Sequence, residues 1–233
     1  MTNKLHTVSR RSALRGAAVG LTGALLTAAT TACTPGGTGP APSPDPSPSR
    51  SNDGAGQDGG RVLLAYFSRA GENYYYGGRT NLDVGNTEVL AGMISAIVPC
   101  DVHRIEAADP YPDSYDATVA RNVREQNTDA RPAIVNPLSA IDQYDTVLLA
   151  SGIWNVRAPM IMSTFAESLD FTGKTVHPVV TYAVSGLGTT ERDYGASCRG
   201  ASIADGLAVR GEEVDDARPA VETWLRQNGL LDG

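Results

Sequence analysis

Residues 61–88 constrain the fold more than any other stretch of this chain. They open with a continuous apolar run, Val62–Ser68, which is typical of a strand buried on both faces of a parallel sheet. A turn rich in Ser, Gly, Asn and Thr follows, and a helix pattern begins at Thr87. Such a turn gathers backbone N–H groups and hydroxyls at the positive end of a helix dipole, which favours phosphate binding. The sequence therefore predicts a strand–turn–helix unit with a phosphate site.

The first 33 residues have the composition of an export signal. They contain four basic residues and no Asp or Glu, and an apolar run of small residues spans 17–32. The segment Ser9–Leu14, with Arg10 and Arg11, resembles a twin-arginine signal. A transmembrane anchor is the alternative, but it needs about 20 strongly apolar residues. This run is shorter and contains Gly and several Thr, so an export signal is favoured.

Cys33 closes this run and resembles the cleavage-site cysteine of a bacterial lipoprotein. Ala32 fits that pattern, whereas Thr30 stands where Leu is usual. The sequence thus predicts either a lipid anchor at Cys33, on the outer side of the cytoplasmic membrane, or a discarded signal that ends there. Residues 34–60 are rich in Pro, Gly, Ser and Asp and have no large apolar side chain, which predicts a disordered linker.

The charge of the chain argues against nucleic acid as a partner. Without residues 1–33, 15 Lys and Arg remain against 26 Asp and Glu, a net charge of −11. Nucleic-acid-binding proteins use Lys and Arg to displace counterions from phosphates. The acidic balance favours basic or neutral partners, although solubility alone would also explain it.

Residues 61–233 have the length of one domain and alternate between strand and helix patterns. Strands are predicted at 62–68, 101–105, 146–151, 176–182 and 203–209, and helices at 87–98, 114–128, 158–169 and 215–228. Alternating strands and helices imply a parallel sheet covered on both faces. We therefore expect a three-layer α/β/α domain that binds ligands at the carboxyl ends of its five strands.

Three loops follow predicted strands at that end. The first begins at Ser68, the second spans Gly152–Pro159 and contains Trp154, and the third spans 181–189 and contains Tyr182. Phosphate donors, aromatic side chains and flexible Gly backbone together suit a flat ring system with a polar edge. Trp154 alone would be assigned to the core, because Trp is mostly buried. Its position beside the two other loops favours a ligand contact.

Five stretches together resemble the flavodoxin-like FMN proteins over essentially all of residues 61–233. They are AYFSRAG at 65–71, GNTEVLA at 85–91, SGIWNVRAP at 151–159, TFAESLDFTGKTV at 164–176 and GLAVRG at 206–211. The resemblance implies a five-stranded parallel sheet in the order 2-1-3-4-5 and non-covalently bound FMN. The phosphate would lie in the first loop and the isoalloxazine ring between the second and third.

The resemblance also implies roles for individual residues. The phosphate would be bound by Ser68, Asn86 and Thr87, supported by Arg69 and Gly85. The ring would be lined on one side by Trp154, Asn155 and Val156 and on the other by Tyr182, Ser185, Gly186 and Leu187. Backbone N–H groups of these loops would set the potential, while the redox chemistry belongs to the flavin.

The first loop departs from the family pattern, which is a compact Thr/Ser-x-Thr-Gly-Asn-Thr turn. Here thirteen residues, Glu72–Val84, separate its two halves. If this insertion loops out, Ser68 and Gly85 can still converge; if it does not, Arg69 or Asn73 replaces the missing donors. The insertion is expected either to place Tyr74, Tyr75 and Tyr76 over the flavin or a substrate, or to form a disordered surface hairpin.

Other chemistries find little support. His103 and His177 are predicted near strand starts, opposite the loop end, and no residues show metal-ligand spacing. A Ser-His-Asp hydrolase would need a histidine beside Ser185, and none is predicted there. In the 2-1-3-4-5 order Cys100 and Cys198 lie by opposite edge strands, too far apart for a disulfide. We expect two unpaired, mostly buried thiols.

The sequence therefore predicts an exported, membrane-tethered FMN protein that transfers electrons. It would act as an electron carrier or as an FMN-dependent oxidoreductase linked to NAD(P)H or a quinone, with a redox protein or a small electron donor or acceptor as its partner. No residue is assigned a catalytic role. The alternative is a non-catalytic ligand-binding module on a flavodoxin-like scaffold that has lost FMN, because fold alone does not determine function.

Overall fold

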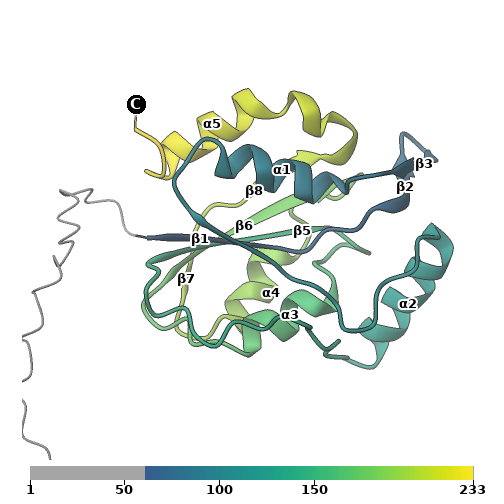
Figure 1. Cartoon of the computed structure of the whole chain (residues 1–233), viewed down its shortest axis with the longest axis horizontal. Helices are drawn as coiled ribbons and strands as arrows, with labels where there is room; N and C mark the ends of the chain where they lie inside the picture. Colours follow the sequence, from purple (N-terminus) through teal and green to yellow (C-terminus); the bar gives the residue numbers. More distant parts are fainter. Residues whose placement is uncertain (1–60, 233) are drawn as a thin grey trace, which may run out of the picture. The chain divides into compact units, whose positions relative to one another are not determined.

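The computed structural model describes residues 61–232, so the predicted signal, Cys33 and the linker lie outside the described residues. The chain alternates strands and helices (Figure 1). The strands are β1 (Val62–Tyr66), β2 (Gly71–Tyr75), β3 (Gly78–Leu82), β4 (Asp101–Arg104), β5 (Thr146–Gly152), β6 (Thr175–Tyr182), β7 (Ser202–Ile203) and β8 (Leu207–Arg210). The helices are α1 (Asn86–Ser95), α2 (Tyr115–Asn127), α3 (Met160–Glu167), α4 (Thr190–Ser197), the 3-10 helix η1 (Gly211–Asp216) and α5 (Arg218–Gln227).

The central sheet is parallel and runs in the order β4-β1-β5-β6, with both β7 and β8 paired to the outer side of β6. The predicted α/β class is confirmed, and the strands follow the predicted 2-1-3-4-5 sequence. The expectation of five strands is wrong in one respect, because two short strands occupy the fifth position in place of a single strand over 203–209.

The break between β7 and β8 has a local cause. It faces His177 and Pro178 of β6, and Pro has no N–H to donate to a neighbouring strand. The carbonyl of Asp205 turns out of the sheet, lying 3.2 Å from His177 Nδ1 and accepting a hydrogen bond from Trp224 Nε1 at 3.2 Å. Side chains therefore pair with the backbone that the ladder leaves free.

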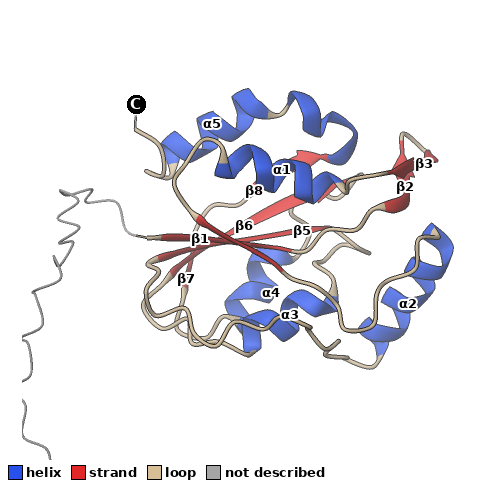
Figure 2. Cartoon of the chain, in the orientation of Figure 1, coloured by secondary structure: helices blue, strands red, loops and turns tan. Residues whose placement is uncertain are grey.

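Helices cover both faces of the sheet, which confirms the predicted three layers (Figure 2). In β1, Leu63 and Ala65 point into the core shared with α3 and α4, whereas Leu64 and Tyr66 point into the core shared with α1 and α5. Because successive strand residues point to opposite faces, a strand buried on both must be apolar throughout, as the run at 62–68 predicted.

Helix α2 lies beyond the carboxyl end of the sheet (Figure 1). It buries polar side chains, among them Asn122 and Glu125, and leaves Val119 and Val123 41% and 40% exposed. The buried carboxylate of Glu125 accepts hydrogen bonds from Tyr111 Oη at 2.8 Å and Arg121 Nε at 2.7 Å. This network fixes α2 at the sheet end and leaves its two valines partly uncovered.

The insertion forms an ordered antiparallel hairpin, β2–β3, so the expectation of disorder is wrong. Tyr76 and Gly77 have φ of 44° and 86°, as a two-residue type I′ turn requires. One side is attached to α2, because Arg79 Nη2 bonds Asp116 Oδ1 at 2.6 Å and its guanidinium lies 4.4 Å from the Tyr115 ring centre. The other side is attached to η1, because the Tyr76 N–H donates to Glu212 Oε1 at 3.0 Å.

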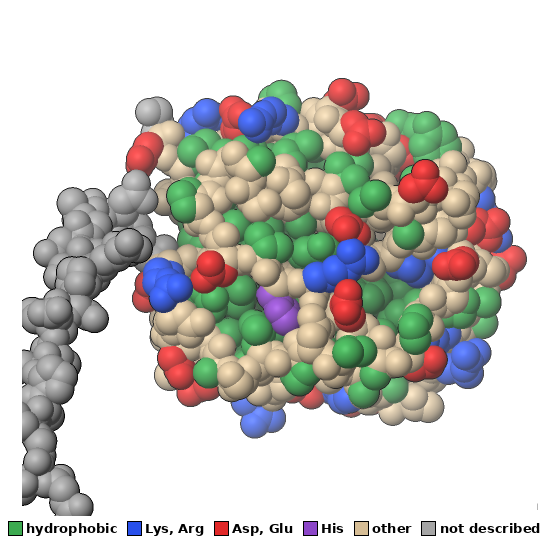
Figure 3. Space-filling view, in the orientation of Figure 1, with side chains coloured by type: hydrophobic (Ala, Val, Ile, Leu, Met, Phe, Trp, Pro, Cys, Tyr) green, Lys and Arg blue, Asp and Glu red, His purple; other side chains and the backbone are tan. Residues whose placement is uncertain are grey.

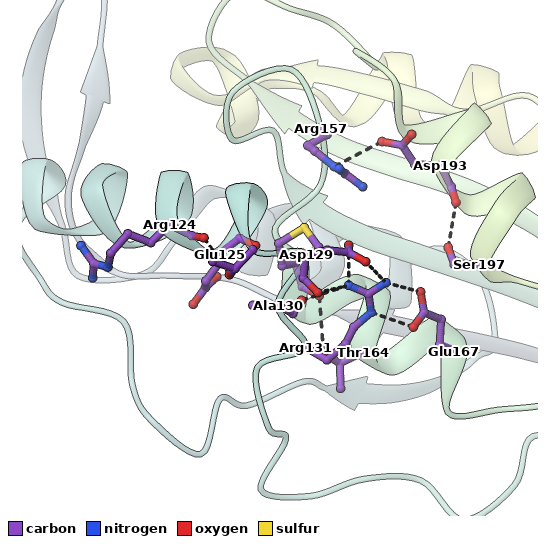
Figure 4. A network of polar contacts seen from close by, with 12 residues as sticks. Arg124, Glu125, Asp129, Ala130, Arg131, Arg157, Thr164, Glu167, Asp193 and Ser197 are labelled. Atoms are coloured by element: carbon purple, nitrogen blue, oxygen red, sulfur yellow. Dashed lines mark hydrogen bonds and ion pairs between the residues drawn. The ribbon is translucent and has the colours of Figure 1, made fainter. Parts of the chain in front are cut away.

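A second polar network ties the segment after α2 to α3 (Figure 4). Arg131 forms a two-pronged bond with Glu167, both contacts at 2.7 Å, and also bonds Asp129 Oδ1 at 2.8 Å. Nearby, Arg157 Nε lies 3.4 Å from Asp193 of α4. These contacts connect the surface segments around the sheet end to the helices beneath it.

The distribution of charged side chains and the positions of Cys100 and Cys198 can be compared with the expectations from the sequence. Acidic and basic side chains are interspersed over the face in Figure 3, without a continuous basic patch. Cys100 precedes β4 at one edge and Cys198 precedes β7 at the other, and both are free, Cys198 being buried. Within residues 61–232, none of the helices is long and apolar enough to cross a bilayer.

Candidate functional site

The two halves of the predicted phosphate loop meet at Gly85. A Cβ on this residue would overlap Ser68 Oγ and would lie 2.5 Å from the Arg69 carbonyl oxygen. Because Gly85 has φ of −70° and ψ of 145°, any residue fits its backbone, and the requirement for Gly is one of space. The insertion loops out between Arg69 and Gly85, and the alternative in which Ser68 and Gly85 stay apart is wrong.

The convergence brings a set of donors to the first turn of α1. Ser68 Oγ accepts the Glu88 N–H at 3.1 Å, which leaves its hydroxyl proton free to donate. The buried Thr87 hydroxyl is paired with Thr181 Oγ1 at 2.7 Å, so the Thr87 side chain is committed to β6. The first-turn N–H groups of Asn86 and Thr87 have no partner within an α-helix and complete the donor set.

Arg69 has a mainly structural set of contacts. Its Nη1 donates to the carbonyls of Pro112 and Asp113 at 3.2 and 3.0 Å, and its Nη2 donates to that of Glu72. Burial lowers the pKa of the guanidinium, and the nearby Asp113 and Glu72 carboxylates oppose that shift. Nε is buried and has no partner among the described residues, so it remains available to a ligand.

A cavity of about 370 Å³ lies at this end of the sheet. Seven of the twelve residues predicted to bind the cofactor line it, namely Ser68, Arg69, Asn86, Thr87, Trp154, Asn155 and Tyr182. The other lining residues come from the start of the hairpin, α2, the ends of β5 and β6, and η1, and they include Asn73, Tyr74, Tyr115, Val119, Val123, Thr181 and Glu212. The first and second predicted loops and the start of the third thus open on one space.

Trp154 belongs to both the core margin and the cavity wall. Its ring packs edge to face on Phe67 and Tyr111, with ring centres 5.7 and 5.0 Å apart, and the residue is half-buried. Asn155 and Val156 have φ of 53° and 66°, and the Trp154 N–H bonds the Arg157 carbonyl at 2.8 Å, so the loop is a tight turn. A β-branched residue at positive φ is strained, and such strain concentrates at functional sites.

The remaining five predicted residues, Gly85, Val156, Ser185, Gly186 and Leu187, lie outside the cavity lining. The Val156 side chain is 52% exposed, and its carbonyl accepts the Thr189 N–H at 2.8 Å. Residues 185–188 form a turn that leads into α4, with Leu187 packed against Gly206. Their binding roles stay predictions, and the third loop reaches the cavity through Tyr182 and Ala183.

Residues of α2 and η1 also line the cavity, which was not predicted from the sequence. One signal was available for α2, because Val119 and Val123 are spaced by four on an otherwise polar helix and thus share a face. For Glu212 the sequence offers no comparable signal, since it is one of several acidic residues after Gly211.

The two histidines within residues 61–232 lie away from the cavity. His103 is in β4, stacked on Phe165, and His177 is in β6 against Trp224. Burial lowers the pKa of both imidazoles. Among residues 61–232, no cluster of three or more His, Cys, Asp or Glu side chains has the arrangement of a metal site.

The order of the strands and the position of the cavity at their carboxyl ends define a flavodoxin-like domain. The sequence profile of the flavodoxin family matches residues 61–228, and the chain belongs to that family. No match was found among curated proteins.

Two solved structures from Bacteroides are similar to the chain. A candidate flavoprotein from Bacteroides uniformis has 27% identity and a TM-score of 0.57, and the match covers 72% of this chain and 99% of that one. A candidate flavoprotein from Bacteroides eggerthii has 26% identity and a TM-score of 0.57, with 72% and 98% covered.

Proposed function

We propose that this protein binds FMN non-covalently in the cavity and transfers electrons through it. The observation that carries the proposal is the convergence of the first-turn donors of α1 with Trp154 and Tyr182 around one space. A helix N-terminus with a free hydroxyl suits a phosphate, and aromatic walls suit a flat ring. Membership of the flavodoxin family and two similar structures named as candidate flavoproteins support the same cofactor.

The dimensions and the donor set of the cavity fit this ligand. Its volume of about 370 Å³ lies within the range of roughly 300–1,000 Å³ for small-molecule sites. The phosphate end would rely on backbone N–H groups and the Ser68 hydroxyl, because the Nη groups of Arg69 are already bonded to carbonyls. Tyr74 of the hairpin lines the cavity and would cover the ligand, whereas Tyr75 and Tyr76 are exposed outside it.

FMN, when bound, supplies the redox chemistry, accepting and releasing electrons at its ring. The chain would orient the ring between Trp154 and Tyr182 and hold the phosphate at α1. Val156 and Val184, which are 52% and 77% exposed, belong to the loops that contain Trp154 and Tyr182 and would meet the electron donor or acceptor. We propose a redox protein, a quinone or a nicotinamide as that partner, and no side chain is assigned to proton transfer.

The visible absorption spectrum of the purified chain tests the proposal. A yellow protein with flavin bands supports it, and so does a colourless one that retains these bands after FMN has been added and unbound FMN removed by gel filtration. A protein that stays colourless after the same treatment overturns it and leaves the non-catalytic ligand-binding module as the function to pursue.

We also propose that the protein acts outside the cytoplasmic membrane, held by a lipid on Cys33. The support is the signal-like composition of residues 1–33, the paired Arg10 and Arg11, and the linker composition of 34–60. A twin-arginine route would suit a protein that folds around its cofactor before export.

A further inference from the structure

Glu212 is one of only two charged residues among the described residues that line the cavity, the other being Arg69. It sits on η1, next to Gly211, whose missing side chain makes room for the Asn86 side chain at the start of α1. The carboxylate therefore lies beside the donor-rich end of the cavity, although a carboxylate is an acceptor and repels a phosphate. Its presence calls for a ligand group that donates.

The two oxygens of this carboxylate have different surroundings. Oε1 accepts the Tyr76 N–H from the hairpin tip at 3.0 Å. Oε2 is buried and has no hydrogen-bond partner among the residues that the structure describes. Leaving a buried carboxylate oxygen unpaired costs free energy, and buried polar atoms in proteins are nearly always paired. A donor supplied by the ligand would remove this cost.

From these contacts we infer that Glu212 Oε2 accepts a hydrogen bond from a hydroxyl of the sugar-alcohol chain that links the flavin ring to its phosphate. This inference rests on the proposed function. An ionised carboxylate is acceptor-only, the phosphate offers it no donor at neutral pH, and the ring is expected between Trp154 and Tyr182. The hydroxylated chain is the part of FMN that carries O–H donors, and it lies between those two ends.

The assignment makes Glu212 a specificity-determining residue with two contacts. Oε1 binds the backbone of the hairpin tip, and Oε2 binds the hydroxylated chain of the ligand. The same side chain therefore contacts both the hairpin and the ligand. When the single acceptor oxygen of glutamine accepts the Tyr76 N–H, its NH2 group faces the ligand, where it can donate to the hydroxyl oxygen but cannot accept the hydroxyl proton. Glu212→Gln should therefore replace a charge-assisted hydrogen bond by a weaker neutral one while keeping the size of the side chain.

Comparing the affinities of two ligands isolates the contribution of the hydroxyl contact to binding. FMN carries the hydroxylated chain, and a flavin with a plain five-carbon alkyl phosphate at N10 keeps the ring and the phosphate but has no hydroxyls. Dissociation constants for both are measured by fluorescence titration on the full chain and on Glu212→Gln, Glu212→Ala and Glu213→Gln. Glu213 is the matched control, because its side chain is 61% exposed and it neighbours Glu212 on η1.

We expect Glu212→Ala to bind FMN at least tenfold more weakly, about 1.4 kcal/mol, and Glu212→Gln to show a smaller loss, while both bind the alkyl phosphate flavin within about twofold of the unchanged chain. Glu213→Gln should change neither constant. Equal weakening for both ligands overturns the inference, because Glu212 would then act on the phosphate or through the hairpin. Unchanged or tighter FMN binding overturns it as well.

The wild-type titration distinguishes this failure from a failure of the proposed function. If the unchanged chain binds neither ligand, the proposed function fails and the inference fails with it. If it binds FMN but the Glu212 variants show no selective loss, only the inference fails. Thermal unfolding of each variant shows whether the fold is retained.

Discussion

Gly85 joins two segments that are sixteen residues apart in sequence, and the phosphate end of the cavity depends on their contact. The joint is made by the absence of a side chain, since the Ser68 hydroxyl and the Arg69 carbonyl occupy the space where a Cβ would be. The family resemblance implied a supporting role for Gly85 in phosphate binding, and the structure shows that a residue with a side chain would not fit between the two segments. A single methyl group at this position should therefore push the two halves apart.

We expect Gly85→Ala to destabilise the fold by about 1–3 kcal/mol, the usual cost of overpacking, and to abolish tight FMN binding. Chemical denaturation and flavin titration measure the two effects. Gly92→Ala is the control, because Gly92 lies exposed in the same helix with nothing within 4 Å of its Cβ position. That change should stabilise the protein by about 0.5–1 kcal/mol. Equal FMN affinity in both variants would contradict the role of the joint.

Trp154→Ala should weaken FMN binding by about 1 kcal/mol or more, since aromatic pairs contribute roughly 0.5–1.5 kcal/mol beyond the area they bury. Quenching of flavin fluorescence on titration gives the affinity. The ring also packs on Phe67 and Tyr111, so the melting temperature should fall too. Trp154→Phe keeps an aromatic ring there and should retain most of both properties. Unchanged affinity in the Ala variant would assign Trp154 to the core alone.

At the scale of elements, most strands and helices were predictable, including the polar helix α2 and the short strand β4, whereas helix α4 and the order of the hairpin were not. The strands at 62–68 and 146–151 are uninterrupted apolar runs, and each was predicted within two residues of its observed ends. Helix α4 was missed because its eight residues contain Tyr194 as their one large apolar side chain. The hairpin was left open because its order depends on contacts with α2 and η1, which are remote in sequence.

Arg131 links the end of α2 to α3, and this link gives a pH dependence that can be worked out. Hydrogen bonds from Arg131 lower the pKa of Glu167 below its ordinary 4.5 and that of Asp129 below its ordinary 3.8. Groups with a depressed folded pKa contribute stability that is complete above the unfolded pKa and is lost as the pH falls through the folded pKa. Asp129 is largely exposed, so the contribution comes mainly from the partly exposed Arg131–Glu167 pair and is at most about 1 kcal/mol.

We therefore expect Arg131→Gln to lower the melting temperature by a few degrees at most at neutral pH, since about 1 kcal/mol corresponds to roughly 2–4 °C in a chain of this size. The difference in melting temperature between the unchanged chain and Arg131→Gln should stay constant down to about pH 5. It should become smaller below that pH, because the carboxylates lose their charge. Calorimetry between pH 3 and 7 measures it. Arg192→Gln, at a side chain 77% exposed, should show little change at any pH. A difference that becomes larger in acid would contradict the assignment.

For the molecule as a whole, the alternation of strands and helices predicted the class and the family resemblance predicted the strand order. Neither predicted the split outer strand, which depends on Pro178 lying opposite residues 204–206 in the folded sheet. The candidate site was predicted in its phosphate and aromatic loops, because those follow strands directly. Its outer wall was not, because α2 reaches the cavity by lying beyond the end of the sheet, and no local pattern encodes that position.

The location of the whole protein is testable through Cys33. If a lipid anchors the chain, Cys33→Ala should move it from the membrane fraction to the soluble extracytoplasmic fraction. Arg10→Lys combined with Arg11→Lys should instead retain an unprocessed, larger chain in the cytoplasm. Immunoblots of fractionated cells report both. A Cys33→Ala protein that stays with the membrane would exclude the lipid anchor as its means of attachment.

The closed joint at Gly85 has a consequence for how this architecture can diversify. Because Ser68 and Gly85 meet directly, residues 72–84 form an appendage whose length is uncoupled from the sheet, and closing a longer loop costs only about 0.6 kcal/mol per doubling. The position is thus a natural graft point, where segments of other lengths and compositions can be exchanged while the phosphate end is kept. Evolution or design can change what stands over the cavity here without rebuilding the fold beneath it.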